Sequence, residues 1–207
     1  MAKLYFTYSA MNAGKSAMLL QAAHNYRERG MAVMLWTSSH HAPHPGAPHG
    51  EIASRIGLTA PARVFGPGED LFAAIAAAHQ DGAIGAVFFD EAQFLTEPQV
   101  WALARVADDL DIPVLCYGLR TDFTGALFEG AAALLALADD LREARTICWC
   151  GAKATMNLRR DSSGRAVTGG ERVGVAKQSY TPLCRKHFRE AMDSAGAEDR
   201  LDLKARA

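Results

Sequence analysis

This 207-residue chain has no excess of either charge, no long apolar run and few cysteines, and these three shortages exclude several classes of protein. Neither sign of charge is in excess, with 22 Lys and Arg against 23 Asp and Glu, so the chain lacks the basic surplus of proteins that coat nucleic-acid backbones. No apolar run approaches the roughly 20 residues that a membrane-spanning helix needs. We therefore expect no nucleic-acid partner and no membrane partner. Neither shortage excludes a local site for a small anionic ligand.

Cysteine is the third shortage, with 4 in the chain, of which Cys148, Cys150 and Cys184 lie late. In a reducing compartment, clustered cysteines indicate metal ligands more readily than disulfides. The first residues carry one Lys and no apolar run that ends in a cleavage site, so we expect no signal peptide and a cytoplasmic location. With 49% hydrophobic residues, the chain can bury a globular core.

Short apolar runs alternate with segments of helical periodicity as far as residue 119. This pattern predicts strands at 3–8, 31–37, 84–91 and 112–119, and helices at 17–30, 69–80 and 98–110. Near-continuous apolar strands separated by helices are typical of a parallel sheet that is covered on both faces. The predicted fold class is therefore α/β. After about residue 145 the pattern changes to short runs with glycines, which indicates a small separate β-rich unit closed by a helix from Pro182.

The segment after the first strand, SAMNAGKS, matches the phosphate-loop pattern G-x-x-x-x-G-K-[ST] except at its first position. Backbone N–H groups at the start of the following helix can bind phosphate oxygens, Lys15 would reach the β and γ phosphates, and Ser16 would bind Mg²⁺. The alternative is an ordinary strand–turn–helix connection that contains GKS by chance. The candidate ATP-binding residues here are Ser9, Ala10, Met11, Asn12, Ala13, Gly14, Lys15 and Ser16.

Two acids end the apolar run AVFFDE. Asp90 has the position of the acid that holds Mg²⁺ in phosphate-loop enzymes. Glu91 follows it and can accept a proton from an attacking hydroxyl or water, whereas alone it would be a solvated charge at a strand end. ATPases and kinases both have a Glu at this position, so Glu91 does not distinguish an ATPase from a kinase.

Two short pairs, Cys148-x-Cys150 and Cys184-x-x-His187, have the arrangement of a closed tetrahedral zinc site. Such a zinc would be structural; the alternative is buried apolar cysteines beside a surface histidine. A second group of histidines lies in the loop 40–50, between Pro and Gly residues that give no fixed ligand geometry, so a mobile surface loop is favoured there over a metal site: His40, His41, His44 and His49.

The loop SAMNAGKS, the stretch DEAQFL, the segment CYGLRTDF and the C-x-C…C-x-x-H pairs strongly resemble the bacterial and cytosolic-type thymidine kinases, from Lys3 to about Met192. The resemblance implies transfer of the ATP γ-phosphoryl group to the 5′-hydroxyl of thymidine, giving thymidine monophosphate for nucleoside salvage and DNA synthesis. It implies a RecA-like P-loop parallel sheet core with a small zinc-binding β-rich C-terminal domain. ATP, Mg²⁺ and a structural Zn²⁺ are the implied cofactors.

By the same resemblance, Glu91 is the catalytic proton acceptor, Asp90 and Ser16 hold Mg²⁺, and Ala92 and Gln93 complete the nucleotide-binding motif. The implied zinc ligands are Cys148, Cys150, Cys184 and His187. The thymine site of the family is built largely from main-chain groups of a lasso loop, here about 164–180. The residues expected to enclose the substrate are Met11, Phe94, Leu119, Phe123, Phe128, Val173, Val175 and Tyr180.

We expect a P-loop ATP-binding domain at 1–145, a zinc-binding lasso domain at 146–192 and a flexible tail at 193–207. A homotetramer and feedback inhibition by thymidine triphosphate (dTTP) are implied by resemblance alone. The chain departs from the family after the second strand, where SSHHAPHPG lacks the usual Asp-x-Arg pair, and at Val175, which stands at one position of a Gly-Gly pair that relatives often show. Two alternatives stay open: an ATPase whose zinc unit binds nucleic acid, and a kinase that prefers deoxyuridine to thymidine.

Overall fold

The structure is a computed structural model that describes residues 1–41, 49–170 and 179–205. The chain divides into two compact units. The first unit comprises Met1–Tyr8, Gly14–Arg120 and Phe128–Ala144. The second unit comprises Ser9–Ala13, Thr121–Leu127 and Arg145–Ala207. The segment SAMNAGKS is therefore shared, with its first five residues in the second unit and its last three in the first.

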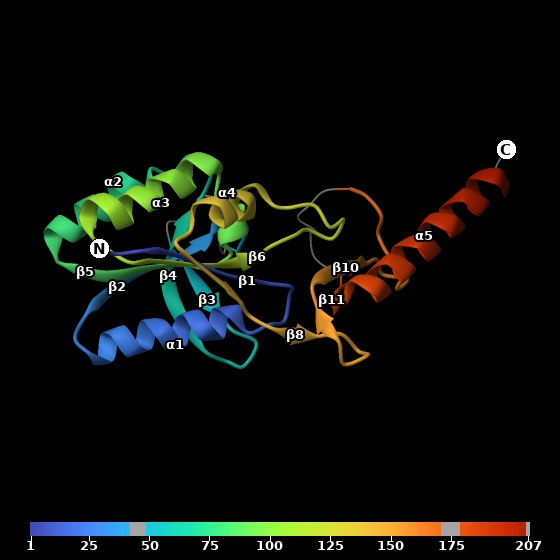
Figure 1. Cartoon of the computed structure of the whole chain (residues 1–207), viewed down its shortest axis with the longest axis horizontal. Coiled ribbons are helices and arrows are strands. Elements are labelled where there is room, and N and C mark those ends of the chain that lie inside the picture. The colour runs from blue at the N-terminus through green and yellow to red at the C-terminus, as the bar shows by residue number, and fades with distance from the viewer. Residues whose placement is uncertain (42–48, 171–178, 206–207) are drawn as a thin grey trace. The chain divides into compact units, whose positions relative to one another are not determined.

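Over the described residues, the first unit contains a seven-stranded sheet in the order β3-β4-β2-β5-β6-β1-β7 (Figure 1). The pairs β1–β7, β2–β4, β2–β5 and β5–β6 are parallel, and β3 runs antiparallel to β4 at the edge. The predicted α/β class is confirmed. The strands are β1 (Leu4–Ser9), β2 (Ala32–Ser38), β3 (His49–Ala53), β4 (Thr59–Phe65), β5 (Ile84–Phe89), β6 (Val114–Leu119) and β7 (Asp140–Glu143).

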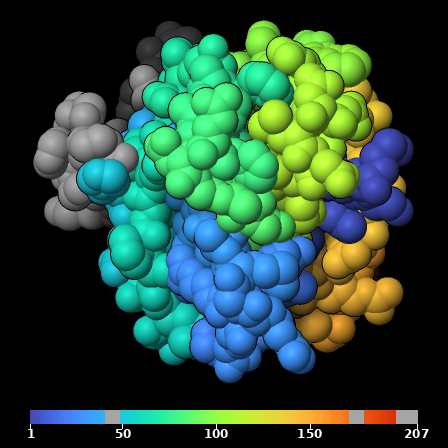
Figure 2. Space-filling model, turned by 90° about the vertical axis from the view of Figure 1, so that its left-hand side faces the viewer, coloured from blue at the N-terminus to red at the C-terminus, as the bar shows by residue number. Residues whose placement is uncertain are grey.

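Helices cover both faces of this sheet. Alternate residues of β5 enter two cores: Val87 and Phe89 pack on the side of α2, α3 and α4, while Ala86 and Phe88 pack against α1. Figure 1 shows α2 and α3 on one face and α1 on the other, and Figure 2 shows these three helices (teal to yellow-green, and blue) from the end of the unit. The helices are α1 (Lys15–Glu28), α2 (Leu71–Asp81), α3 (Glu97–Leu110) and α4 (Glu129–Leu137), with short 3₁₀ turns η1 (Ser39–His41) and η2 (Ala92–Phe94).

The second unit is built around small two-stranded ladders. Its described elements are β8 (Thr146–Ile147), β9 (Lys153–Ala154), β10 (Met156–Arg160), β11 (Ser179–Leu183) and α5 (Arg185–Ala205). Both ladders, β8–β9 and β10–β11, are antiparallel. Among the described residues of this unit, one small cluster of buried apolar side chains packs between the ladders and α5: Cys148, Ala154, Leu158, Leu183 and Phe188. So small a core ordinarily needs a metal or a disulfide to be stable.

Several elements differ from the sequence-based expectations. The pattern did not predict β3 and β4, because β3 is an exposed edge strand and β4 contains Pro61, which normally argues against a strand. Pro182 lies in β11, and the closing helix begins at Arg185. That helix continues to Ala205, and the flexible tail expected at 193–207 stays a prediction. Of the described helices, none is both long and apolar enough to cross a membrane.

Candidate active site and metal centre

The phosphate-loop segment turns sharply into α1. Gly14 has φ of 78°, a left-handed conformation that glycine adopts without strain, and Lys15 begins the helix. No side chain caps this helix start, so its first N–H groups suit an anion. The Lys15 side chain is buried, which lowers the pKa of its ammonium group, while the carboxylates of Glu91 and Asp90 raise it and keep a positive charge favourable here.

Asp90 follows β5 and is held to the neighbouring strand by its N–H, which donates to the Trp36 carbonyl at 2.9 Å. Burial and the nearby Glu91 raise the pKa of its carboxyl to about 6, although the Ser16 hydroxyl, which donates to it, opposes the shift. Oδ1 of Asp90 is buried without a hydrogen-bond partner. A buried carboxylate oxygen left unpaired beside a hydroxyl forms a donor set that a hard cation would satisfy.

Glu91 has φ of 55°, in the left-handed region that residues other than glycine rarely adopt. Such strain is characteristic of functional positions. Its Oε2 accepts a hydrogen bond of 2.5 Å from Gln93 Nε2, and Gln93 Oε1 accepts one of 2.8 Å from the Leu119 N–H. The carboxylate is therefore oriented from the neighbouring strand β6.

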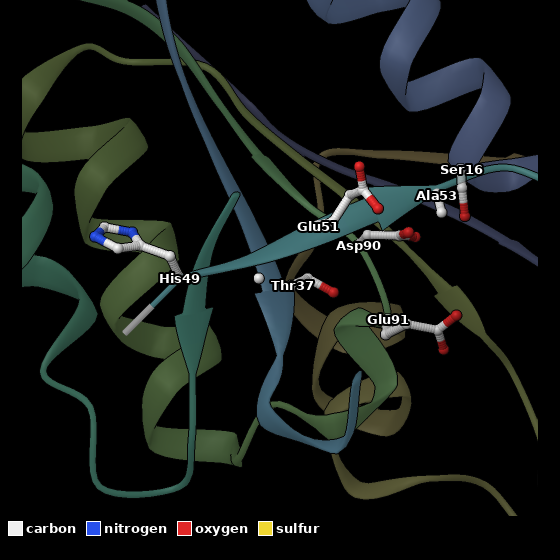
Figure 3. A pocket seen from close by; sticks show the side chains of 8 residues that line it. Ser16, Thr37, His49, Glu51, Ala53, Asp90 and Glu91 are labelled. Carbon is white, nitrogen blue, oxygen red and sulfur yellow. The ribbon is translucent and has the colours of Figure 1, made fainter. Parts of the chain in front are cut away.

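Asp90 and Glu91 line a cavity of about 650 Å³ in the first unit. Its other lining residues are Ser16, Thr37, His49, Gly50, Glu51 and Ala53. In Figure 3 the Asp90 carboxylate points toward the hydroxyl of Ser16, whereas the His49 ring points away from both. The cavity lies at the carboxyl ends of β2 and β5, where open parallel sheets bind their ligands. Sequence reasoning missed Thr37 and Glu51 as site residues. The end of an apolar run at Thr37 was a usable signal, whereas β3 offered none.

The residues predicted to enclose a nucleoside are divided between the units. In the first unit, Phe94 packs against Phe128 at 5.7 Å between ring centroids, and Leu119 lies in the same apolar cluster. In the second unit, Phe123 is fully buried beneath the Arg159 guanidinium, 4.7 Å from the ring centroid. Met11 and Tyr180 also belong to the second unit. Val173 and Val175 lie outside the described residues.

Among the described residues, the histidine-rich segment contributes no metal-binding group. The one group of three or more His, Cys, Asp or Glu side chains found there lies in the second unit. His40 packs against the Phe94 ring with 4.4 Å between centroids, and His49 begins β3. His44 lies outside the described residues.

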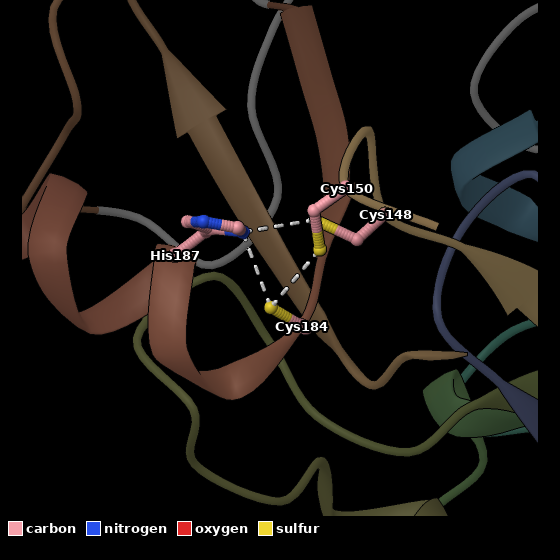
Figure 4. A group of neighbouring side chains, drawn as sticks. All are labelled: Cys148, Cys150, Cys184 and His187. Carbon is pink, nitrogen blue, oxygen red and sulfur yellow. Dashed lines mark hydrogen bonds between the residues drawn. The ribbon is translucent and has the colours of Figure 1, made fainter. Parts of the chain in front are cut away.

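Four side chains of the second unit converge to form a metal site: Cys148, Cys150, Cys184 and His187 (Figure 4). Their ligand atoms all lie within 4.8 Å of one another, with His187 Nδ1 at 3.4 Å from Cys148 Sγ and 3.3 Å from Cys184 Sγ. A tetrahedral zinc with bonds of about 2.3 Å to sulfur and 2.0 Å to nitrogen separates its ligand atoms by about 3.5–3.8 Å. This three-sulfur, one-nitrogen set therefore fits a structural zinc.

Comparison with known proteins identifies the family. The family model described as thymidine kinase matches residues 2–188. The chain belongs to the thymidine kinase family. A thymidine kinase of Ruegeria pomeroyi is 59% identical over 96% of this chain and 99% of its own length, and one of Mesorhizobium japonicum is 56% identical over 96% and 97%. A thymidine kinase of Escherichia coli O157:H7 is 52% identical over 93% of each chain. The suspected thymidine kinase resemblance is thereby confirmed.

Proposed function

We propose that this protein is a thymidine kinase that transfers the γ-phosphoryl group of ATP to the 5′-hydroxyl of thymidine, giving thymidine monophosphate and ADP for deoxynucleotide salvage and DNA synthesis. Family membership supports the activity, and one structural observation supports the chemistry. Lys15, Ser16, Asp90 and Glu91 come together in the first unit, with both acids and the hydroxyl on one cavity. Phosphoryl transfer depends mainly on positioning and charge neutralisation, which these groups supply.

Glu91 is the proposed catalytic base. As the 5′-oxygen of thymidine bonds to the γ-phosphorus, the bond from that phosphorus to the β–γ bridging oxygen breaks, and the hydroxyl proton passes to the Glu91 carboxylate. Gln93 and the left-handed backbone of Glu91 fix the direction of that carboxylate. A base held in place needs no reorientation when the hydroxyl arrives.

Lys15 and the start of α1 are proposed to bind the phosphates of ATP, with the loop residues Ser9–Gly14 and the Ala92–Gln93 turn completing the nucleotide site. Ser16 and Asp90 would hold Mg²⁺, since the donor set fits a hard cation. When bound, Mg²⁺ neutralises the phosphate oxygens and the charge that develops on the leaving group.

The zinc-bearing domain is proposed to span 146–192 and to carry the nucleoside-covering loop at about 164–180, after a P-loop domain at 1–145. Met11, Phe94, Leu119, Phe123, Phe128, Val173, Val175 and Tyr180 are proposed to enclose the nucleoside. The family resemblance further supports a cytoplasmic homotetramer that dTTP inhibits.

A nucleoside panel assay with ATP and Mg²⁺ tests this function. Thymidine, deoxyuridine, deoxycytidine and the purine deoxynucleosides are incubated separately, and monophosphate formation is followed with ADP release. Thymidine should give the highest kcat/KM. ADP release that ignores every nucleoside but rises with added DNA would instead indicate the nucleic-acid-binding ATPase, and a preference for deoxyuridine would revise the substrate.

A further inference from the structure

Asn157 lies on β10 of the second unit and is 2% exposed. Its position between Met156 and Leu158 in a strand gives it no evident catalytic role. A buried carboxamide is costly unless its oxygen and nitrogen are both hydrogen-bonded. The partners of this side chain therefore explain why a polar residue lies there.

Both ends of the Asn157 side chain bind main chain that is distant in sequence. Oδ1 accepts a hydrogen bond of 2.7 Å from the Met11 N–H, and Nδ2 donates one of 3.1 Å to the Thr121 carbonyl. Met11 is the third residue of the phosphate-loop segment, and Thr121 follows β6. A single buried side chain thus holds the first half of the nucleotide loop to the segment Thr121–Leu127.

We call the two hydrogen bonds of Asn157 the anchor of the nucleotide loop. The residue after Met11 shows what the anchor does to the conformation of the loop. Asn12 has φ of 63°, a left-handed conformation that asparagine adopts more readily than other residues except glycine, and here the chain on its N-terminal side is held in place. The 2.7 Å bond to Met11 fixes the chain immediately before that residue, and Thr146 Oγ1 donates a longer bond of 3.4 Å to the Asn12 carbonyl. The turn that leads to Gly14 and Lys15 is therefore enforced by side chains of β10 and β8.

The anchor is connected to the metal site through one ladder. Asn157 lies opposite Pro182 in the β10–β11 register, Met156 lies opposite Leu183, and Cys184 follows directly. The metal-ligand segment and the anchor of the nucleotide loop are thus parts of one small antiparallel unit.

We propose that Asn157 is a positioning residue for ATP, which holds the Met11 N–H and so keeps the phosphate loop in the shape that binds the nucleotide. The proposal rests on the ATP-dependent activity proposed above. In this arrangement the Met11 N–H is occupied by Asn157, which leaves phosphate binding to later N–H groups of the loop.

The central test compares Asn157→Leu, which preserves most of the volume and removes both hydrogen bonds, with the full-length parent protein. The Kd for a non-hydrolysable ATP analogue in the presence of Mg²⁺ should rise about tenfold, and the KM for ATP should follow it, because the Met11 N–H and the Thr121 carbonyl lose their partner. The kcat at saturating ATP should change less than about threefold, since the catalytic base is untouched. An unchanged Kd would overturn the proposal.

Leu158→Val is the matched control. Leu158 is fully buried on the same strand, but its side chain has no group that could hydrogen-bond to the loop. It should lower the melting temperature and leave the ATP-analogue Kd within about twofold. An equal rise in Kd for both variants would mean that packing of the unit, rather than the Asn157 bond, sets the affinity, and would refute the positioning role.

A measurement on the parent protein does not depend on whether an Asn157 variant folds. With ¹⁵N-labelled methionine the chain gives at most 7 backbone signals, and Met11→Leu assigns the one of interest. Its amide should exchange slowly with solvent in the absence of ATP; fast exchange would contradict the bond. If the protein binds the ATP analogue but phosphorylates no nucleoside, the proposed function fails while the Asn157 comparison still decides this inference.

Discussion

The Gln93 carboxamide connects the candidate base to the neighbouring strand: Nε2 donates to Glu91 Oε2, and Oε1 accepts from the Leu119 N–H at 2.8 Å. Gln93 is 2% exposed, so water does not readily replace either bond. The strand also leaves room for this side chain, because a Cβ at Gly118 would lie 2.8 Å from Gln93 Oε1. The orientation of Glu91 thus depends on Gln93, which lies in the turn that follows it, and on strand β6, which holds the Gln93 side chain.

Replacing Gln93 with Met should lower kcat about tenfold while changing the KM for ATP less than about threefold. The side chain keeps its approximate volume but no longer orients Glu91, and the loss of one positioning hydrogen bond to a charged group corresponds to about that factor. Steady-state kinetics with thymidine checks the result. Gln21→Met, at an exposed position of α1, is the control and should leave both constants unchanged.

Glu91→Gln should lower kcat by about 10²–10⁴-fold, because the amide is nearly the same size but cannot accept the hydroxyl proton. Nucleotide binding should be retained, which calorimetric titration with ADP and Mg²⁺ measures. The exposed Glu69→Gln variant controls for the loss of one negative charge. A kcat near that of the parent would exclude Glu91 as the base.

Magnesium binding should weaken as the pH falls through about 6, because the Asp90 carboxyl has its pKa raised to about 6 and must lose its proton to bind the cation. The raised pKa also means that the folded, metal-free protein binds this proton more tightly than the unfolded chain does. Its contribution to stability is therefore present at low pH and is lost as the pH rises through about 6. Added Mg²⁺ should compensate at high pH.

Melting temperatures with ADP, with and without Mg²⁺, measure this effect at pH 5.5 and 7.5. The Mg²⁺-induced increase should be clearly larger at pH 7.5. Asp90→Asn should remove the difference between the two pH values, whereas Asp108→Asn, exposed on α3, should preserve it. Equal Mg²⁺-induced increases in melting temperature at both pH values in the parent would show that Asp90 does not bind the metal.

The sequence predicts the central layers of the fold because their signal is local. Continuous apolar runs such as IGAVFF, followed by amphipathic segments, place β5 and its neighbours to within about two residues. β4 escapes prediction because its pairing with β2 and β3 outweighs the local cost of Pro61. The role of Asn157 escapes for a similar reason, since its partners Met11 and Thr121 are 146 and 36 positions away in the chain. Motifs report chemistry that adjacent residues share, whereas long-range hydrogen bonds leave no pattern in a single sequence.

Removing one zinc ligand should release the metal and loosen the second unit. Cys150→Ser should reduce the zinc content from about one per chain to nearly none, since a serine hydroxyl is a poor zinc ligand and the unit has a small core. Atomic absorption and thermal melting measure the two effects. Cys116→Ala, in the buried β6 strand, should retain its zinc. A parent protein that contains no zinc after purification without chelators would refute the site.

Gly130→Ala should disturb the turn that carries Ala92 and Gln93. A Cβ at Gly130 would lie 2.6 Å from the Leu95 carbonyl oxygen and 2.7 Å from that of Ala92, and neither main-chain atom can move without displacing η2. We expect a loss of about 3 kcal/mol in the free energy of unfolding, together with a lower kcat, because the displaced turn also positions Glu91 through Gln93. Denaturant unfolding and kinetics on the same sample measure both. Gly82→Ala is the matched control: its φ of −177° is extended and nothing lies within 4 Å of the added methyl group, so stability and kcat should stay close to those of the parent. Should Gly130→Ala prove as stable and active as Gly82→Ala, the packing of α4 on the turn would not be what holds the catalytic base in place.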